Sequence, residues 1–169
     1  HFHHDGTNWK LVGSSAAAGG GSGSNITYTT DNTYISTTTS MPGDNTIPQN
    51  TEGAEYTQLA TAYTPLDAAN NLIIEAYFPV VGSSGNMGNI ALFKDSDASA
   101  LQVTDGGNTS TGEISGAYLQ FIVSAGSITA RTYKIRYGPN SGTMWIGGNS
   151  GELFSTAKHA YLKITEYTP

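Results

Sequence analysis

The feature that most constrains the fold is the strict alternation of apolar and polar side chains in the C-terminal segment 158–167. Its small and aliphatic members share one phase and would cover a core: Ala160, Leu162 and Ile164. Its polar members share the other phase: His159, Lys163 and Thr165. Tyr161 and Tyr167 belong in part to this polar face. A period of two with one apolar face is typical of a half-buried β-strand. The segment therefore predicts a strand with one face on a core and the other toward solvent.

Similar short segments recur along the chain, and each is bounded by Gly, Asn, Asp or Pro. We expect strands at 9–12, 26–29, 33–37, 55–63, 71–80, 89–94, 100–104, 117–124, 132–138, 143–147 and 158–167. Residues 41–53 are predicted to be an ordered loop, and no segment shows helical periodicity beyond one possible turn at 95–99. Many short strands at close spacing predict an all-β, antiparallel β-sandwich or jelly-roll-like domain.

Composition supports one such domain. The chain has 169 residues, of which only 12% are charged and 37% are hydrophobic, with 21 glycines. Polar but uncharged strands with tight turns suit a sandwich with hydroxyl-rich outer faces. We expect a lead strand at 1–12, a Gly/Ala/Ser-rich linker at 13–24 and the sandwich at 25–169.

Charge and cysteine content exclude several classes of function. The net charge is −6 and the basic residues form no long run, so a nucleic-acid partner is not expected. Cysteine is absent, which excludes disulfides, thiolate metal sites and cysteine nucleophiles. The longest apolar run, 72–81, contains Glu75 and Pro79, so no membrane insertion is expected.

The residues best suited to ligand binding lie in the second half of the chain. In 132–137, apolar residues alternate with Thr132, Lys134 and Arg136, which predicts an outward basic face. Trp145 follows one strand later, and exposed aromatic rings suit sugar binding, although a core or subunit-interface position is the alternative for a tryptophan. Recognition usually resides in loops on a rigid scaffold, so the Asn/Gly/Ser-rich loops carrying Asn108 and Asn140 complete the candidate site.

The sequence gives weaker indications of metal binding and catalysis than of ligand binding. His1 and His3 would point the same way in a strand, and several such pairs together could bind a transition metal. Asp95 and Asp97 lack the other ligands of a calcium loop, so solvated carboxylates are expected there. No carboxylate pair is singled out for glycoside cleavage, and the Gly-Asn-Ser-Gly turn at 148–151 is interpreted as a hairpin loop. We therefore predict no enzymatic activity and no cofactor apart from that possible metal.

Five segments in order carry a family resemblance: Ile47–Gly53 (IPQNTEG), Asn71–Ala76 (NLIIEA), Ile90–Asp95 (IALFKD), Ala130–Pro139 (ARTYKIRYGP) and Leu162–Tyr167 (LKITEY). Together they resemble the C-terminal receptor-binding (head) domains of bacteriophage tail fibres and tail spikes. Residues 1–12 are similar to the short strand that links a fibre shaft to its head. The linker at 13–24 has no counterpart in the family pattern.

This resemblance implies a homotrimer at the tip of a virion tail fibre, extracellular when it functions. It implies adhesion to a bacterial surface glycan, such as polysaccharide or LPS, or to an outer-membrane receptor, with His1 and His3 on the trimer axis as the possible metal site. One alternative is a trimerisation and folding cap without a receptor role. Another is a monomeric carbohydrate-binding module, which needs an aromatic platform on one sheet face. A polysaccharide depolymerase is the third.

Overall fold

The structure is a computed structural model of the chain and describes residues 2–4, 9–11, 25–84, 87–107 and 114–169, with backbone alone for 2–4 and 9–11. β1 (Phe2–His4) and β2 (Trp9–Leu11) form an antiparallel pair; β2 falls within the strand expected at 9–12, and β1 was not expected. The linker predicted at 13–24 lies outside the described residues.

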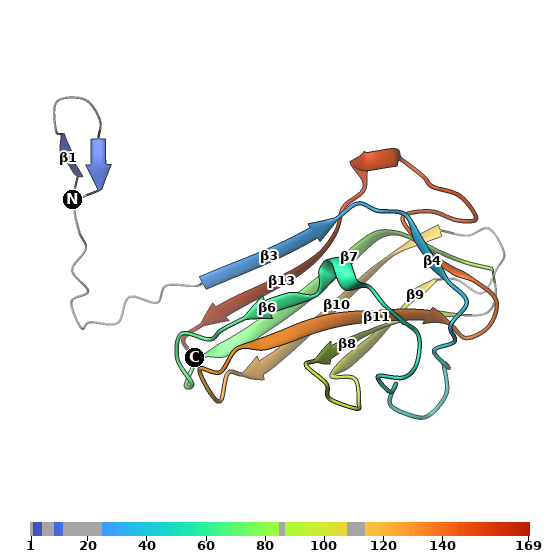
Figure 1. Cartoon of the computed structure of the whole chain (residues 1–169), viewed down its shortest axis with the longest axis horizontal. Coiled ribbons are helices and arrows are strands. Elements are labelled where there is room, and N and C mark those ends of the chain that lie inside the picture. Colours follow the sequence, from blue (N-terminus) through green and yellow to red (C-terminus); the bar gives the residue numbers. More distant parts are fainter. Residues whose placement is uncertain (1, 5–8, 12–24, 85–86, 108–113) are drawn as a thin grey trace.

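Two antiparallel sheets make up the rest of the described chain (Figure 1). Sheet 1 contains β3 (Asn25–Asp31), β4 (Ile35–Thr37), β7 (Asn71–Ser83), β10 (Ile114–Ser124), β12 (Met144–Ile146) and β13 (Ala160–Tyr167). Sheet 2 contains β5 (Ala54–Glu55), β6 (Thr61–Tyr63), β8 (Gly88–Lys94), β9 (Gln102–Gly107) and β11 (Arg131–Pro139). Two 3₁₀ turns, η1 (Thr57–Leu59) and η2 (Ser155–Ala157), are the helical elements of the described part.

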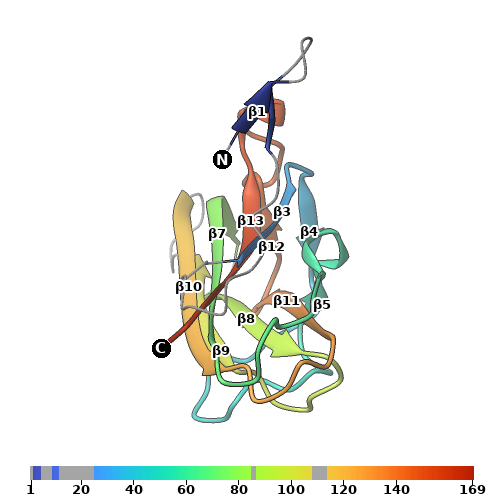
Figure 2. The same cartoon turned by 90° about the vertical axis from the view of Figure 1, so that its left-hand side faces the viewer.

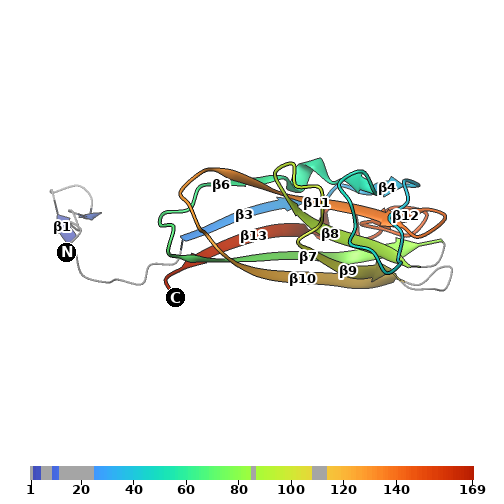
Figure 3. The same cartoon turned by 90° about the horizontal axis from the view of Figure 1, so that it is seen from below.

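The long strand β7 organises sheet 1. It pairs with β10 along one edge, and with β13 and then β12 along the other. β3 and β4 continue the sheet beyond β13 and β12. Figure 3 shows β3, β13, β7 and β10 running side by side along the length of the sandwich.

Sheet 2 repeats this arrangement around β11, which pairs with β8 on one edge and with β5 and β6 on the other. β9 lies outside β8. The order β10–β7–β13/β12–β3/β4 faces the order β9–β8–β11–β6/β5 (Figure 2). This is the strand order of an eight-position jelly roll, so the predicted fold class is confirmed.

The core lies between the sheets and follows from the alternation in the sequence. β7 contributes Leu72, Ile74, Ala76 and Phe78, and β13 contributes Leu162 and Ile164. From sheet 2 they meet Ile90, Leu92, Tyr133, Ile135 and Tyr137. Each large apolar side chain buried in this way stabilises the fold by about 1.5–3 kcal/mol. The predicted inward phases of β11 and β13 are therefore confirmed.

Several expected strands differ in their bounds or continuity, and the strand expected at 100–104 spans Gln102–Gly107. The predicted strand at 55–63 is interrupted by η1, because Tyr56 and Leu59 are both buried and their three-residue spacing suits a 3₁₀ turn. The Tyr56 hydroxyl also donates a hydrogen bond to Asp31 Oδ2 at 2.7 Å. The strand expected at 33–37 begins only at Ile35. No helix of the described residues is long and apolar enough to cross a membrane.

The loop at 41–53 covers part of the outer side of sheet 2. Met41, Ala91 and Phe93 form a second small cluster there, with Ala100 packed against it. Since Ala91 and Phe93 alternate with the core residues Ile90 and Leu92, β8 is buried on both sides. An isolated bridge between Gln49 and Ser99 fixes the loop, as expected for an ordered extended segment.

Candidate functional site

On the outer face of sheet 1, four neighbouring strands each contribute a tyrosine to one aromatic surface, and β13 carries a further outward tyrosine, Tyr167, at its far end. Tyr161 of β13 lies opposite Tyr77 of β7, which lies opposite Tyr118 of β10. On β3, Tyr28 lies opposite Lys163, two residues along from the partner of Tyr161, and its ring centroid is 5.1 Å from that of Tyr161. The centroids of Tyr161 and Tyr77 are 5.8 Å apart. We call the four residues of this aromatic surface the tyrosine row.

The sheet holds these rings toward solvent because each tyrosine lies out of phase with the buried residues of its strand. Tyr77, for example, lies between the fully buried Ala76 and Phe78. Tyr28 is 54% exposed and Tyr118 is 46% exposed. Gly116 leaves the sheet flat beside Tyr77, whose ring atoms lie within 3.7 Å of where a β-carbon would be. The result is an accessible aromatic surface.

A line of polar side chains borders the tyrosine row. Lys163 Nζ lies 2.6 Å from Glu75 Oε2, and Gln120 lies opposite Glu75 on β10. The Tyr118 hydroxyl donates to Glu75 Oε1 at 2.8 Å and accepts a hydrogen bond from Gln120 Nε2 at 3.2 Å. We call Lys163, Glu75 and Gln120 the polar row. Its members tie the edge of the aromatic surface into one hydrogen-bonded network.

The electrostatics of the polar row fix its charge state. The hydrogen bond from Lys163 is the main reason that the pKa of Glu75 lies below its ordinary value, and the same bond raises the pKa of Lys163. Burial, helped by the hydrogen bond to Glu75, raises the pKa of Tyr118 to about 12. At neutral pH the row therefore contains one positive and one negative charge, beside an uncharged Tyr118.

Beyond the polar row the same face becomes apolar. Ile26, Ile73 and Ile122 lie in the next register position, with Thr165 between the first two. Ile26 and Ile122 are exposed. Chemically, the outer face of sheet 1 offers flat rings, a few hydrogen-bonding groups and an aliphatic border.

The structure does not bring the predicted ligand-binding residues together. Met144 and Ile146 are buried in the core, so Trp145 projects from the outer face of sheet 1. It is half-buried there, opposite Gly82 on β7 and roughly 16 Å along the strand from Tyr77. Lys134 and Arg136 project from the outer face of sheet 2, on the other side of the sandwich.

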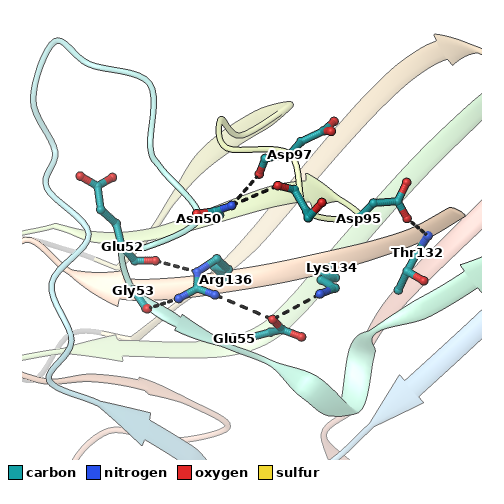
Figure 4. A network of polar contacts seen from close by, with 10 residues as sticks. Asn50, Glu52, Gly53, Glu55, Asp95, Asp97, Thr132, Lys134 and Arg136 are labelled. Carbon is teal, nitrogen blue, oxygen red and sulfur yellow. Dashed lines mark hydrogen bonds and ion pairs between the residues drawn. The ribbon is translucent and has the colours of Figure 1, made fainter.

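The outward face of β11 is less basic than the sequence indicates. Glu55 lies opposite Arg136 in the register, and its Oε2 is 3.7 Å from Lys134 Nζ and 3.8 Å from Arg136 Nη1 (Figure 4). Arg136 also donates to the backbone carbonyls of Glu52 and Gly53 at 2.8 and 2.7 Å. Arg136 thus holds the loop against β11, in addition to facing solvent.

The other predicted site residues have local roles or lie beyond the described part. Asn140 Oδ1 accepts a hydrogen bond from the Gly43 backbone at 3.1 Å, which ties two loops together. Asn108 and His1 lie outside the described residues, and the side chain of His3 does too. The possible metal site at His1 and His3 therefore stays a prediction.

The minor motifs have local structural roles. Asp95 Oδ1 accepts from the Thr132 backbone N–H at 2.7 Å, and Asp97 pairs with Lys94 at 3.1 Å. No group of three His, Asp or Glu side chains suited to a metal gathers within the described residues. The turn at 148–151 is closed by a bridge between Gly148 and Glu152, which confirms the hairpin interpretation.

The sequence interpretation missed the tyrosine row. Its signal is present, because a tyrosine occupies an outward position in four separate strands. Identifying the row requires the pairing of β3, β13, β7 and β10, which joins segments far apart in the chain.

Comparison with known proteins gives distant structural likenesses only. No protein-family model and no curated protein matches the chain by sequence. The C-terminal CBM6 of LamC, a marine laminarinase from Zobellia galactanivorans, is 14% identical with a TM-score of 0.38, over 83% of this chain and 99% of that domain. A Bacillus endospore appendage that forms disulfide-linked pili is 14% identical with a TM-score of 0.33, over 91% and 96%.

The VP2 subviral particle of infectious bursal disease virus is also similar, at 13% identity and a TM-score of 0.37, over 85% of this chain and 41% of the viral chain. All three TM-scores lie below 0.5. The strand order of the chain itself defines its class, an antiparallel β-sandwich with jelly-roll topology.

Proposed function

We propose that this chain is a non-enzymatic adhesion domain that binds a neutral glycan across the tyrosine row. The observation that carries the proposal is the row itself: rings from neighbouring strands, with two successive centroid spacings of 5.1 and 5.8 Å, on a solvent-facing sheet. The negative face of an aromatic ring attracts the weakly positive C–H groups of a sugar. The polar row beside it supplies groups that bind hydroxyls.

The dimensions of the row suit an extended ligand. Four neighbouring strands span three inter-strand steps of about 4.8 Å each, or about 14 Å in total. A glycan chain that lies across the strands would contact the rings of Tyr28, Tyr161, Tyr77 and Tyr118 in succession. An internal segment of a polysaccharide fits such an open face better than a single terminal sugar, which would contact one ring.

The charges of the polar row indicate a neutral ligand. Lys163 and Glu75 neutralise each other at 2.6 Å, so the row offers no net charge to an anionic polysaccharide. The chain as a whole carries a net charge of −6, which disfavours anionic partners further. We expect binding to depend only weakly on ionic strength.

A binding assay with ring deletions tests the proposal. Soluble neutral glucans and mannans would be titrated by calorimetry and affinity electrophoresis against the parent chain, Tyr28→Ala and Tyr77→Ala. Each variant should weaken binding by about tenfold, the effect of losing roughly 1.4 kcal/mol. The matched control is Phe154→Ala, which removes a 70% exposed aromatic ring from the β12–β13 loop. Equal losses in Phe154→Ala and Tyr77→Ala would contradict the proposal.

The biological setting that we propose is the tip of a bacteriophage tail fibre or tail spike, attached to a bacterial surface glycan in the extracellular medium. The support for this setting is the ordered resemblance of five sequence segments. Three copies in a homotrimer would combine weak sites into strong attachment through effective concentration. Light scattering after gel filtration tests the trimer, which requires a mass near three times 17.7 kDa.

A second candidate function is trimerisation itself, favoured by the exposed Ile26 and Ile122 at the border of the same face. The double variant Ile26→Lys, Ile122→Lys separates the two functions. If this face joins subunits, the variant becomes a monomer. If the face binds glycan, the oligomeric state stays as in the parent chain while Tyr77→Ala still lowers glycan affinity.

We also propose that the domain catalyses no reaction. The one ion that we propose is a transition metal at His1 and His3. Incubation with the bound polysaccharide should release no reducing ends and leave its viscosity unchanged. Release of reducing ends would move the assignment to a depolymerase. Elemental analysis of the purified protein, compared with His3→Ala, tests the metal.

A further inference from the structure

A concave surface lies on the opposite side of the sandwich from the tyrosine row. It is an open pocket of about 300 Å³ above β8 and β11, lined by Asn50, Glu55, Phe93, Asp95, Ser96, Lys134 and Arg136. Phe93 lies opposite Lys134 in the β8–β11 register and forms an apolar part of the lining. This volume is at the lower end of the range for small-molecule sites.

The walls of the pocket are held by hydrogen bonds that leave its centre open (Figure 4). Arg136 donates Nε and Nη2 to the carbonyls of Glu52 and Gly53. On the other side, Asn50 Nδ2 donates to the carbonyls of Ser96 and Asp97 at 3.2 and 3.1 Å. Both walls are therefore fixed without a ligand, which lowers the entropic cost of binding.

Three charged groups of the pocket, on Glu55, Lys134 and Arg136, lie close together without hydrogen bonds between them. Glu55 Oε2 is 3.7 Å from Lys134 Nζ and 3.8 Å from Arg136 Nη1, beyond the usual range of an N–H···O hydrogen bond. Within the described part of the chain, Lys134 Nζ pairs with Glu55 and donates no hydrogen bond. Glu55 and Lys134 therefore retain hydrogen-bonding capacity for a ligand in the pocket.

We propose that this pocket is a second ligand site, which binds one neutral sugar residue through a pair of neighbouring hydroxyl groups. One hydroxyl donates to Glu55, and its neighbour accepts from Lys134. A hydroxyl both donates and accepts, so a diol can bridge a carboxylate and an ammonium group that lie 3.7 Å apart. The inference rests on the proposed function for its ligand class, glycan, and adds a separate site.

The charge balance of the pocket favours a neutral ligand over an ion. Lys134 and Arg136 contribute two positive charges, and Glu55 and Asp95 contribute two negative charges, so the lining sums to zero. An anionic ligand would face Glu55, and a cationic ligand would face Lys134. A diol interacts favourably with both groups and leaves their mutual attraction in place.

The test is a titration of the ¹⁵N-labelled chain with methyl glucoside, methyl galactoside and methyl mannoside at millimolar concentrations. Cyclohexanol, which has a single hydroxyl, is the control ligand. At least one glycoside should shift the amide signals of residues 50–55, 93–96 and 134–136, and cyclohexanol should not. Lys134→Met should weaken that binding by about tenfold, since it removes a charged hydrogen-bond donor but keeps most of the stem.

Lys94→Met is the matched control variant. Lys94 has a side chain 31% exposed against 32% for Lys134, and each lysine pairs with one acid. Lys94 does not line the pocket, so Lys94→Met should bind the glycoside as the parent chain does. Equal weakening in both lysine variants would overturn the proposal, as would equal shifts with cyclohexanol or no shifts in the pocket with any glycoside.

The two sites can fail separately. Shifts confined to the tyrosine row would overturn the pocket and leave the proposed function in place. Pocket shifts that persist in Tyr77→Ala, together with unchanged polysaccharide binding by that variant, would support the pocket and overturn the tyrosine row.

Discussion

Tyr161 and Tyr77 lie directly opposite each other on β13 and β7, with ring centroids 5.8 Å apart on the solvent side of the sheet. Tyr161 also contacts Tyr28 at 5.1 Å, so it is in ring contact on both sides. Side chains packed in this way have few rotamers left to lose when a ligand binds. Tyr161 therefore holds Tyr28 and Tyr77 in position, and in the proposed complex it would also contact the glycan.

Replacing Tyr161 should consequently affect binding more than replacing an end of the row. Tyr161→Ala is expected to lower polysaccharide affinity by more than tenfold, a loss above about 1.4 kcal/mol, measured by calorimetry. Tyr161→Phe keeps the ring and should bind almost as the parent chain does. A large loss in Tyr161→Phe would show that the hydroxyl, and not the ring, carries the interaction.

The polar row predicts how binding responds to acid. The pKa of Glu75 is held below its ordinary value, mainly by the hydrogen bond from Lys163, so the charged network is intact at neutral pH and is lost only as the pH falls through the lowered pKa. Affinity should therefore stay constant from neutral pH down to the ordinary carboxyl range, about pH 4.3, and decline only in stronger acid. Affinity electrophoresis at a series of pH values measures this profile.

Glu75→Gln is the companion variant. The amide cannot form the ion pair with Lys163, so this variant should bind more weakly at neutral pH and lose the acid-dependent decline. An unchanged acid limb in Glu75→Gln would assign the decline to another group.

The buried carboxylate of Glu166 predicts a second pH effect, on stability. Glu166 is 1% exposed and accepts hydrogen bonds from Tyr63, the backbone of Leu66 and Asp67, and Asn70. Burial raises the pKa of Glu166, but these hydrogen bonds together outweigh it, so the pKa lies below its ordinary value. The stabilisation is fully present above the unfolded-state pKa of about 4.3 and is lost as the pH falls through the lowered folded-state pKa.

Glu166→Gln should therefore lower the free energy of unfolding by about 3 kcal/mol at neutral pH, measured by urea denaturation, and by less in acid. Glu55→Gln is the control, because its carboxylate is partly exposed and lies 3.7 Å or more from its partners. That variant should change stability by less than about 1 kcal/mol. Equal destabilisation in the two variants would rule out a special role for Glu166.

The fold was largely predictable because alternation is a local property. The strands at 71–80, 132–138 and 158–167 bury the residues that their alternation indicates, because hydrophobic burial favours such strands whichever strand they pair with. The strand at 89–94 is buried on both sides instead, because the loop at 41–53 covers its outer side. The strand expected at 55–63 was wrong in its middle, because burial of Tyr56 and its bond to Asp31 depend on a neighbour 25 residues away.

The candidate site was less predictable for the same reason. Lys134 and Arg136 lie on β11, and Trp145 lies on the next strand in the chain, β12. The two strands belong to different sheets, so their outward side chains lie on opposite faces of the sandwich. The neutralising Glu55 comes from a short strand almost 80 residues before Lys134 and could not be paired with it from the sequence. Pairing between distant strands decides which side chains share a surface.

Two glycines with similar backbone conformations provide a final test of how closely the loop at 41–53 packs on sheet 2. Gly53 has φ +61° and Gly126 has φ +64°, both in the left-handed region. A β-carbon at Gly53 would lie 2.7 Å from the Tyr137 carbonyl oxygen and 2.8 Å from Met41 Cε, while one at Gly126 would meet nothing within 4 Å.

Gly126→Ala should therefore cost only the conformational term, about 1–2 kcal/mol of unfolding free energy. Gly53→Ala should cost clearly more, because the loop must move away from β11. Since Arg136 donates to the Gly53 carbonyl, that movement should also shift the signals of residues 134–136, whereas Gly126→Ala leaves them unchanged. Equal unfolding free energies for the two variants in urea would mean that the loop yields freely, and the pocket beside it would then not be preformed.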